Sequence, residues 1–146
     1  SAASDVYKRQ CFQQQELYDY LVEHNIQPVG YMPIGSPRRP ERDICPEDVA
    51  DLEVPEMQAI AKAHGVHPAL IALKWAHQRG EISIPFSVHN YASNLKCVTE
   101  DPLTEKEMAT IATLEKGNRL VKGQVFLWHG ARDWHDLWDE DGVIVK

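Results

Sequence analysis

The segment 82–88, with the sequence ISIPFSV, constrains the fold more than any other stretch because it lies between two helical patterns. Ile82, Ile84 and Phe86 alternate with Ser83, Pro85 and Ser87, which predicts a short strand that ends near the proline. A strand that leaves one helix and enters another is typical of a parallel α/β protein. Ligands of such proteins bind at the carboxyl ends of the strands, so Phe86 and Ser87 are the first candidates for a binding site.

Length and composition limit the remaining possibilities. A chain of 146 residues has room for one domain at most, and 43% hydrophobic with 25% charged residues is typical of a soluble globular protein. A formal charge of −7 argues against nucleic acid or an anionic membrane as a partner. No apolar run is long enough for a membrane helix. The cysteines, Cys11, Cys45 and Cys97, are odd in number and form no CxxC motif, which favours a cytoplasmic location with free thiols.

The first ten residues, SAASDVYKRQ, resemble one reading frame of a widely used transposon-based sequencing adaptor. We therefore expect residues 1–10 to be an artefact and the natural sequence to begin at Cys11. The alternative is a natural, flexible N-terminus. Codons for the same decapeptide upstream of Cys11 in the intact gene would refute the adaptor hypothesis.

Local signals predict the helices that surround the strands. Residues 13–24 show helical spacing and end at Asn25, and residues 26–31 form a short strand pattern. Pro55 favours the first turn of one helix, and His67 serves as the N-cap of the next. Thr104, with Glu107 three residues later, forms a capping box. Residues 34–54 lack periodicity, which favours a functional or disordered loop.

Several motifs resemble the C-terminal half of an aldo-keto reductase. They are GYMPIGS at 30–36, similar to AYSPLGS; IA at 60–61 with HGVHPALIALKW at 64–75, similar to IAxxHGxTPAQVxLRW; IPFSV at 84–88, similar to IPKSV; and LTEKEM at 103–108, similar to LTEEDM. The segment from Glu16 to Ile26 resembles the helix before the seventh barrel strand. Each motif is weak alone, but together, in the family's order, they are specific.

The resemblance implies an α/β fold: the C-terminal fragment of a (β/α)8 TIM barrel, comprising its last two βα units, an accessory helix and a C-terminal loop. We divide the chain into residues 1–10 (adaptor), 11–119 (partial barrel) and 120–146 (C-terminal loop). The family's catalytic Asp, Tyr, Lys and His belong to the earlier strands, so we expect no catalytic residue here. Two strands cannot close a barrel, and the isolated chain should be aggregation-prone or only partly folded.

The resemblance also assigns a cofactor site, NADP(H) or NAD(H). The implied contacts lie in two groups: Tyr31, Met32, Pro33, Ile34, Gly35 and Ser36, then Phe86, Ser87, Val88 and Asn94. The ring of Tyr31 would stack on the nicotinamide, although a core role is the alternative. Met32 replaces a family serine, which removes one expected polar contact. Trp128 in the C-terminal loop would shape the substrate pocket, although the tail aromatics could equally pack on the barrel or on a partner.

The cation pair expected for the 2′-phosphate of NADP is missing. Phe86 replaces the family lysine, and the arginine expected near Ala92 has no counterpart. His89 and Lys96 are nearby, and Arg38 or Arg39 in the long loop is an alternative source of charge. The sequence therefore predicts relaxed or NAD-leaning cofactor choice.

The leading interpretation is the C-terminal part of an NAD(P)H-dependent reductase of small-molecule carbonyls, inactive alone. The alternative is part of a non-catalytic cofactor-binding barrel, such as an ion-channel auxiliary subunit. No histidine group matches HExxH or a zinc-finger spacing, so no metal site is expected.

Overall fold

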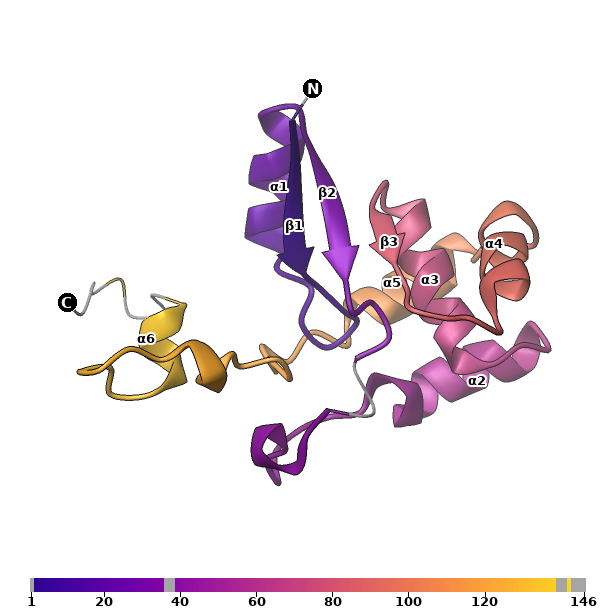
Figure 1. Cartoon of the computed structure of the whole chain (residues 1–146). Coiled ribbons are helices and arrows are strands. Elements are labelled where there is room, and N and C mark those ends of the chain that lie inside the picture. The colour runs from indigo at the N-terminus through magenta and orange to yellow at the C-terminus, as the bar shows by residue number, and fades with distance from the viewer. Residues whose placement is uncertain (1, 36–38, 139–141, 143–146) are drawn as a thin grey trace.

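A computed structural model describes residues 2–35, 39–138 and 142 of the chain (Figure 1). The strands and α-helices are β1 (Ala2–Tyr7), α1 (Gln15–Glu23), β2 (Ile26–Tyr31), α2 (Pro55–Ala63), α3 (Pro68–Gln78), β3 (Ile82–Ile84), α4 (Tyr91–Thr99), α5 (Glu105–Ala112) and α6 (Trp134–Leu137). Short 3-10 turns occupy Glu41–Asp43, Asp51–Glu53 and Gln124–Phe126. The α/β class with alternating strands and helices is the one that the sequence predicts.

The strands form a three-stranded parallel sheet in the order β1-β2-β3. Helix α1 connects β1 to β2 and lies beside both strands, while α2 and α3 precede β3 (Figure 1). Two strands were expected, and this number is wrong. Strand β1 lies within the first ten residues and pairs with β2 from Ala2 opposite Ile26 to Tyr7 opposite Tyr31.

Buried ion pairs anchor the residues that follow β1. The Nζ atom of Lys8 lies 2.5 Å from the Oε1 atom of Glu81, and both side chains are almost fully buried. The Nη1 atom of Arg9 lies 2.6 Å from the Oδ2 atom of Asp51, and neither side chain is exposed to solvent. The decapeptide is therefore part of the packed structure. Its origin as an adaptor concerns the gene rather than the fold and stays a prediction.

The hydrophobic core lies between α2, α3 and α5, where Met57, Ile71, Trp75 and Ile111 are buried together. Local chemistry fixes the ends of these helices. The Nδ1 atom of His67 accepts a hydrogen bond from the backbone N–H of Ala69 at the start of α3, as an N-cap should.

Much apolar surface is left uncovered on the strand side of the molecule. In β3, Ile82 is 54% and Ile84 is 52% exposed, and β1 and β3 form the open edges of the sheet within the described residues. Exposed apolar side chains beside open strand edges favour self-association. The uncovered surface is consistent with the expectation that the isolated chain is aggregation-prone.

The C-terminal tail does pack on the rest of the chain, although α6 stands apart from α4 in Figure 1. The indole N–H of Trp138 donates a hydrogen bond to the backbone oxygen of Lys122 at 2.7 Å. The guanidinium of Arg119 lies 3.9 Å from the centre of the Trp138 ring and 4.5 Å from that of Phe12. Within the described residues, no helix has the length and apolar character needed to cross a membrane.

Candidate functional site: a groove at the strand ends

The carboxyl ends of β2 and β3 open onto a groove with a volume of about 1170 Å³. Its floor comes from the residues that follow the two strands, and its walls come from the first turns of α3 and α4. Arg39, Pro40 and Asp43 of the long loop and residues 120–126 of the tail complete it. The groove therefore lies where a parallel α/β protein binds its ligands.

The groove brings together most of the residues predicted to bind a cofactor. Those that line it are Met32, Pro33, Ile34, Phe86, Ser87, Val88 and Asn94. Tyr31 and Gly35 lie beside this set in the sequence but do not line the groove, and Ser36 falls outside the described residues. Trp128 is partly buried and lines neither this groove nor the smaller cavity described below, so its role in a substrate pocket stays a prediction.

Tyr31 ends β2, where it is partly buried against β1. Its ring centre lies 5.4 Å from that of Tyr7, with the two planes tilted by 35°. Burial raises the pKa of the Tyr31 phenol, with Arg119 opposing the shift, so the group stays a neutral phenol near neutral pH. A neutral aromatic ring at a strand end is suited to stacking, and the stacking role proposed for Tyr31 stays a prediction.

Gly35 allows the chain to turn sharply after β2. Its φ angle is +79°, in the region that favours glycine, and a Cβ atom there would lie 3.0 Å from the Oδ2 atom of Asp51. A side chain at this position would disturb both the backbone and the Arg9–Asp51 ion pair. The backbone geometry therefore requires glycine at position 35, the second glycine of the GYMPIGS motif.

The start of α4 provides hydrogen-bond donors at the groove. The hydroxyl oxygen of Ser87 accepts from the backbone N–H of Asn90 at 2.8 Å, and the hydroxyl of Ser93 donates to the backbone oxygen of Asn90 at 2.9 Å. The Asn90 side chain makes no cap to the helix. The first-turn N–H groups of α4 thus keep their capacity to bind an anion such as a phosphate.

The cations beside the groove are largely paired with carboxylates. Arg39 lines the groove, but its guanidinium lies 2.5 Å from Asp48 and donates to the backbone oxygen of Asp43. Lys122 lies 3.4 Å from Asp48 and 3.7 Å from Glu47. Arg38 falls outside the described residues. Neither Arg39 nor Lys122 offers an uncompensated charge to a phosphate.

Of the two remaining basic candidates, Lys96 and His89, one lines the groove and the other does not. Lys96 pairs with Glu100 at 3.6 Å on α4 and does not line the groove. His89 does line it, directly after Val88. Phe86, which replaces the family lysine, is 93% exposed and presents an apolar ring instead of a charge.

Sequence reasoning missed the tail segment 120–126 as a wall of the groove. This segment is held in place by Lys122, whose Nζ atom lies 2.6 Å from the Sγ atom of Cys45 in the long loop. Burial acts to lower the pKa of Lys122, but the contacts with Cys45 and Asp48 outweigh it and the pKa is raised. No periodicity or motif marks this contact between distant segments.

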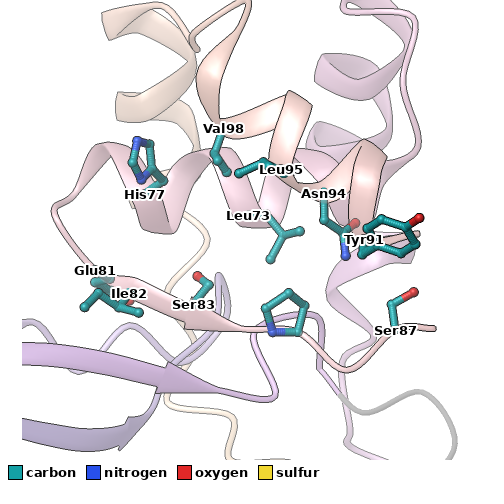
Figure 2. A pocket seen from close by; sticks show the side chains of 11 residues that line it. Leu73, His77, Glu81, Ile82, Ser83, Ser87, Tyr91, Asn94, Leu95 and Val98 are labelled. Atoms are coloured by element: carbon teal, nitrogen blue, oxygen red, sulfur yellow. The ribbon is translucent and has the colours of Figure 1, made fainter. Parts of the chain in front are cut away.

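A second, smaller cavity of about 390 Å³ lies between β3 and α4 (Figure 2). Leu73, Leu95 and Val98 form its helical side, and the Ser83 side chain points toward them from β3. Ser87 and Asn94 line both cavities. Across the described ranges, no group of three or more His, Cys, Asp or Glu side chains is arranged to hold a metal ion.

Comparisons with known proteins agree with the geometry. A model of the aldo/keto reductase family matches residues 4–116. Among curated proteins, aldo/keto reductase slr0942 of Synechocystis sp. is 34% identical over 131 residues, covering 88% of this chain and 40% of the relative. Aldo-keto reductase family 1 member A1 of Xenopus tropicalis is 40% identical over 110 residues, covering 74% of this chain and 33% of the relative.

Solved structures give the same result. A mutant of Gox0644 in complex with NADPH superposes with a TM-score of 0.68 at 27% identity, covering 81% of this chain and 40% of that structure. MGS-M4, an aldo-keto reductase enzyme from a Medee basin deep-sea metagenome library, gives a TM-score of 0.67 at 27% identity, with 80% and 40% coverage. The chain thus spans about 40% of the length of these proteins, and it belongs to the aldo/keto reductase family.

Proposed function

We propose that the chain forms the cofactor-binding end of an NAD(P)H-dependent carbonyl reductase and corresponds to the last strands of a (β/α)8 barrel. The observation that carries the proposal is the groove at the ends of β2 and β3, which gathers residues from both predicted cofactor motifs. The family membership and the NADPH complex of one structural neighbour support a nicotinamide cofactor.

The groove has the chemistry that a dinucleotide needs. The uncapped first turn of α4 and the hydroxyl of Ser87 suit a phosphate, and Gly35 keeps the backbone free of side-chain bulk after β2. Met32 and Ile34 provide apolar surface for the flat rings. When bound, the cofactor supplies a hydride to a carbonyl carbon; the residues of this chain bind and orient it.

We further propose that the 146-residue chain does not reduce carbonyls by itself. The family uses a tyrosine as proton donor, and no tyrosine is among the described residues that line the groove. A cofactor without a positioned proton donor loses the acid catalysis that the reaction needs. The exposed Phe86 ring in place of a lysine favours relaxed or NAD-leaning cofactor choice in the intact enzyme.

Ligand binding to the full chain tests the proposal. A complete site that binds at about 1 μM corresponds to about −8 kcal/mol, so half of the contacts should give roughly −4 kcal/mol and a Kd of about 1 mM. Saturation-transfer difference NMR detects this range. We expect binding of NADH and NADPH, and no oxidation of either when an aldehyde is added.

A matched pair of variants locates the binding. Ser93 lines the groove and its neighbour Ala92 does not, and both are exposed on α4. Ser93→Trp should fill the groove and abolish binding, whereas Ala92→Trp should leave it intact. Absence of binding to the wild-type chain at several times the expected Kd, or equal behaviour of the two variants, would overturn the proposal.

A further inference from the structure

Cys45 and Lys122 bring a thiol and an amine into contact from segments that are 77 residues apart in the chain. The Nζ atom of Lys122 lies 2.6 Å from the Sγ atom of Cys45. Cys45 directly follows the part of the long loop that lines the groove, and Lys122 is one of the tail residues that line it. The contact therefore joins two walls of the groove that come from distant parts of the chain.

Asp48 holds both partners of this contact in place. Its Oδ2 atom accepts a hydrogen bond from the backbone N–H of Cys45 at 2.8 Å, and its own N–H donates to the backbone oxygen of Cys45 at 3.0 Å. Its Oδ1 atom lies 3.4 Å from the Nζ atom of Lys122. A sulfur and a nitrogen that are fixed at contact distance have the arrangement that favours a reaction between them.

The two groups differ in their access to solvent. Cys45 is partly exposed, so a small oxidant can reach its sulfur, whereas Cys11 and Cys97 are buried. The Lys122 side chain is only 4% exposed and lies behind the sulfur within the protein. A second thiol is the usual partner of an oxidised cysteine, but at Cys45 the neighbouring nucleophile is an amine.

We infer that Cys45 and Lys122 form a reversible covalent cross-link, a sulfenamide, when a hydroperoxide oxidises the thiol. In the first step one peroxide oxygen is transferred to the sulfur, so that Cys45 becomes a sulfenic acid and hydrogen peroxide is reduced to water. In the second step the nitrogen of Lys122 bonds to the sulfur and the S–O bond breaks. This site does not depend on the proposed function.

The protons of the second step come from Lys122. Its raised pKa means that it starts as an ammonium with three hydrogens. One proton leaves with the sulfenic oxygen as water, a second goes to solvent, and the nitrogen keeps the third. Two equivalents of a thiol reductant later cleave the S–N bond and are oxidised to a disulfide, which restores the thiol and the amine.

The bond would fasten the long loop to the tail. Both segments line the groove, so the cross-link fixes the separation of two of its walls and reduction releases them. The bond also removes the positive charge of Lys122 from Asp48. The groove would thus respond to the redox state of its surroundings through a contact at its rim.

Peptide mapping of the full chain by mass spectrometry tests the cross-link directly. After treatment with equimolar hydrogen peroxide, we expect a pair of peptides joined between Cys45 and Lys122. Its mass should equal the sum of the two reduced peptides less two hydrogen atoms, and dithiothreitol should restore both peptides. A bridge that retained an oxygen atom would contradict the loss of water in the second step.

A matched pair of lysine variants shows whether the amine is required. Lys122→Arg keeps a positive charge beside Asp48 but lacks the primary amine, so the cross-link should be lost. The sulfenic acid of Cys45 should then accumulate and be trapped by dimedone, which should label little of the wild-type chain. Lys116→Arg, at an exposed lysine earlier in the chain, is the control and should cross-link like the wild type.

Several results would overturn the inference. They are equal dimedone labelling of the wild type and Lys122→Arg, a bond between Cys45 and a different lysine, and a disulfide that joins two chains through Cys45. Wild-type Cys45 that proceeds to a sulfinic acid without a cross-link would overturn it as well, and this result needs no variant to fold. None of these measurements involves the cofactor, so the proposed function is tested separately.

Discussion

His64, the C-cap residue of α2, links that helix to the start of α5 through both of its ring nitrogens. Its Nδ1 atom lies 2.6 Å from the Oδ2 atom of Asp101, and its Nε2 atom lies 3.0 Å from the Oε1 atom of Glu107. Glu107 also completes the capping box of α5 with Thr104. A neutral imidazole has one donor, so both contacts are satisfied only when the ring is protonated.

The pKa of His64 is accordingly raised above its ordinary value of 6.5. The hydrogen bond with Asp101 is the largest cause of the rise, burial opposes it, and Glu107 adds to it. The Nζ atom of Lys74 lies 4.0 Å from the same Asp101 oxygen that His64 contacts. A group with a raised folded-state pKa stabilises the fold fully below its unfolded pKa and loses this effect as the pH rises through the folded value. The link should therefore be strongest below the ordinary pKa of 6.5 and should weaken as the pH rises above it.

We predict that His64→Gln destabilises α5 in the acidic part of this range. The contact with the partly buried Glu107 is a charge-assisted hydrogen bond near the surface, worth about 1 kcal/mol, which is about a fivefold change in a local opening equilibrium. Hydrogen exchange followed by mass spectrometry reports this equilibrium for the peptide that contains α5, after correction for the intrinsic exchange rate. Exchange should be about fivefold faster in the variant at pH 6.

The control is His24→Gln at the end of α1. The His24 ring contacts Tyr20 of the same helix, through a hydrogen bond of Nδ1 with the backbone oxygen and by stacking on the ring, so this variant should leave α5 unchanged. At pH 8.5 the difference between the wild-type chain and His64→Gln should be smaller than at pH 6. A difference that persists undiminished at pH 8.5, or none at pH 6, would refute the double-carboxylate account of His64.

Three further predictions concern the buried pair, the uncovered strand face and the thiols. Asp51→Asn should leave the buried charge of Arg9 without its carboxylate partner, at a cost of about 3–5 kcal/mol, and should speed hydrogen exchange in residues 2–11. Glu53→Gln in the same 3-10 turn should have neither effect. Ile84→Lys should reduce self-association in sedimentation velocity, while Thr99→Lys on exposed surface should change it little; equal effects would contradict a role for β3. Cys45, which is partly exposed whereas Cys11 and Cys97 are buried, should react first with iodoacetamide, and faster labelling of the other two would disprove the packing.

The positions of the helix ends could be predicted because neighbouring residues determine them. Asn25 ends α1 with a φ angle of +55°, His67 caps α3, and Thr104 with Glu107 forms the predicted capping box. Each of these depends on contacts within a few residues. The candidate site could be located for the same reason, because strand ends follow from alternation and a proline.

Strand β1 could not be predicted because its stabilisation is long-range. Lys8 and Arg9 look like exposed charges in the sequence, but they are buried against Glu81 and Asp51, more than forty residues away. Nothing in the local pattern identifies these partners. An assignment of the decapeptide to an adaptor removed it from the fold and gave the wrong number of strands.

The electrostatics of the groove could not be predicted either. The sequence places Arg39 in a charged loop, and only the structure pairs it with Asp48. The tail segment 120–126 becomes a wall of the groove because Lys122 meets Cys45 and Asp48. Such pairings depend on how distant segments meet, and neither periodicity nor spacing encodes them.

The central claim is that the groove at the ends of β2 and β3 holds a nicotinamide dinucleotide, and hydrogen exchange with and without the cofactor tests it most directly. With several millimolar NADH or NADPH, protection should increase in the peptides that contain residues 31–35 and 84–94 and stay unchanged in α1 and α5. Protection confined to other segments, or no change at a cofactor concentration several times the expected Kd of about 1 mM, would contradict the account.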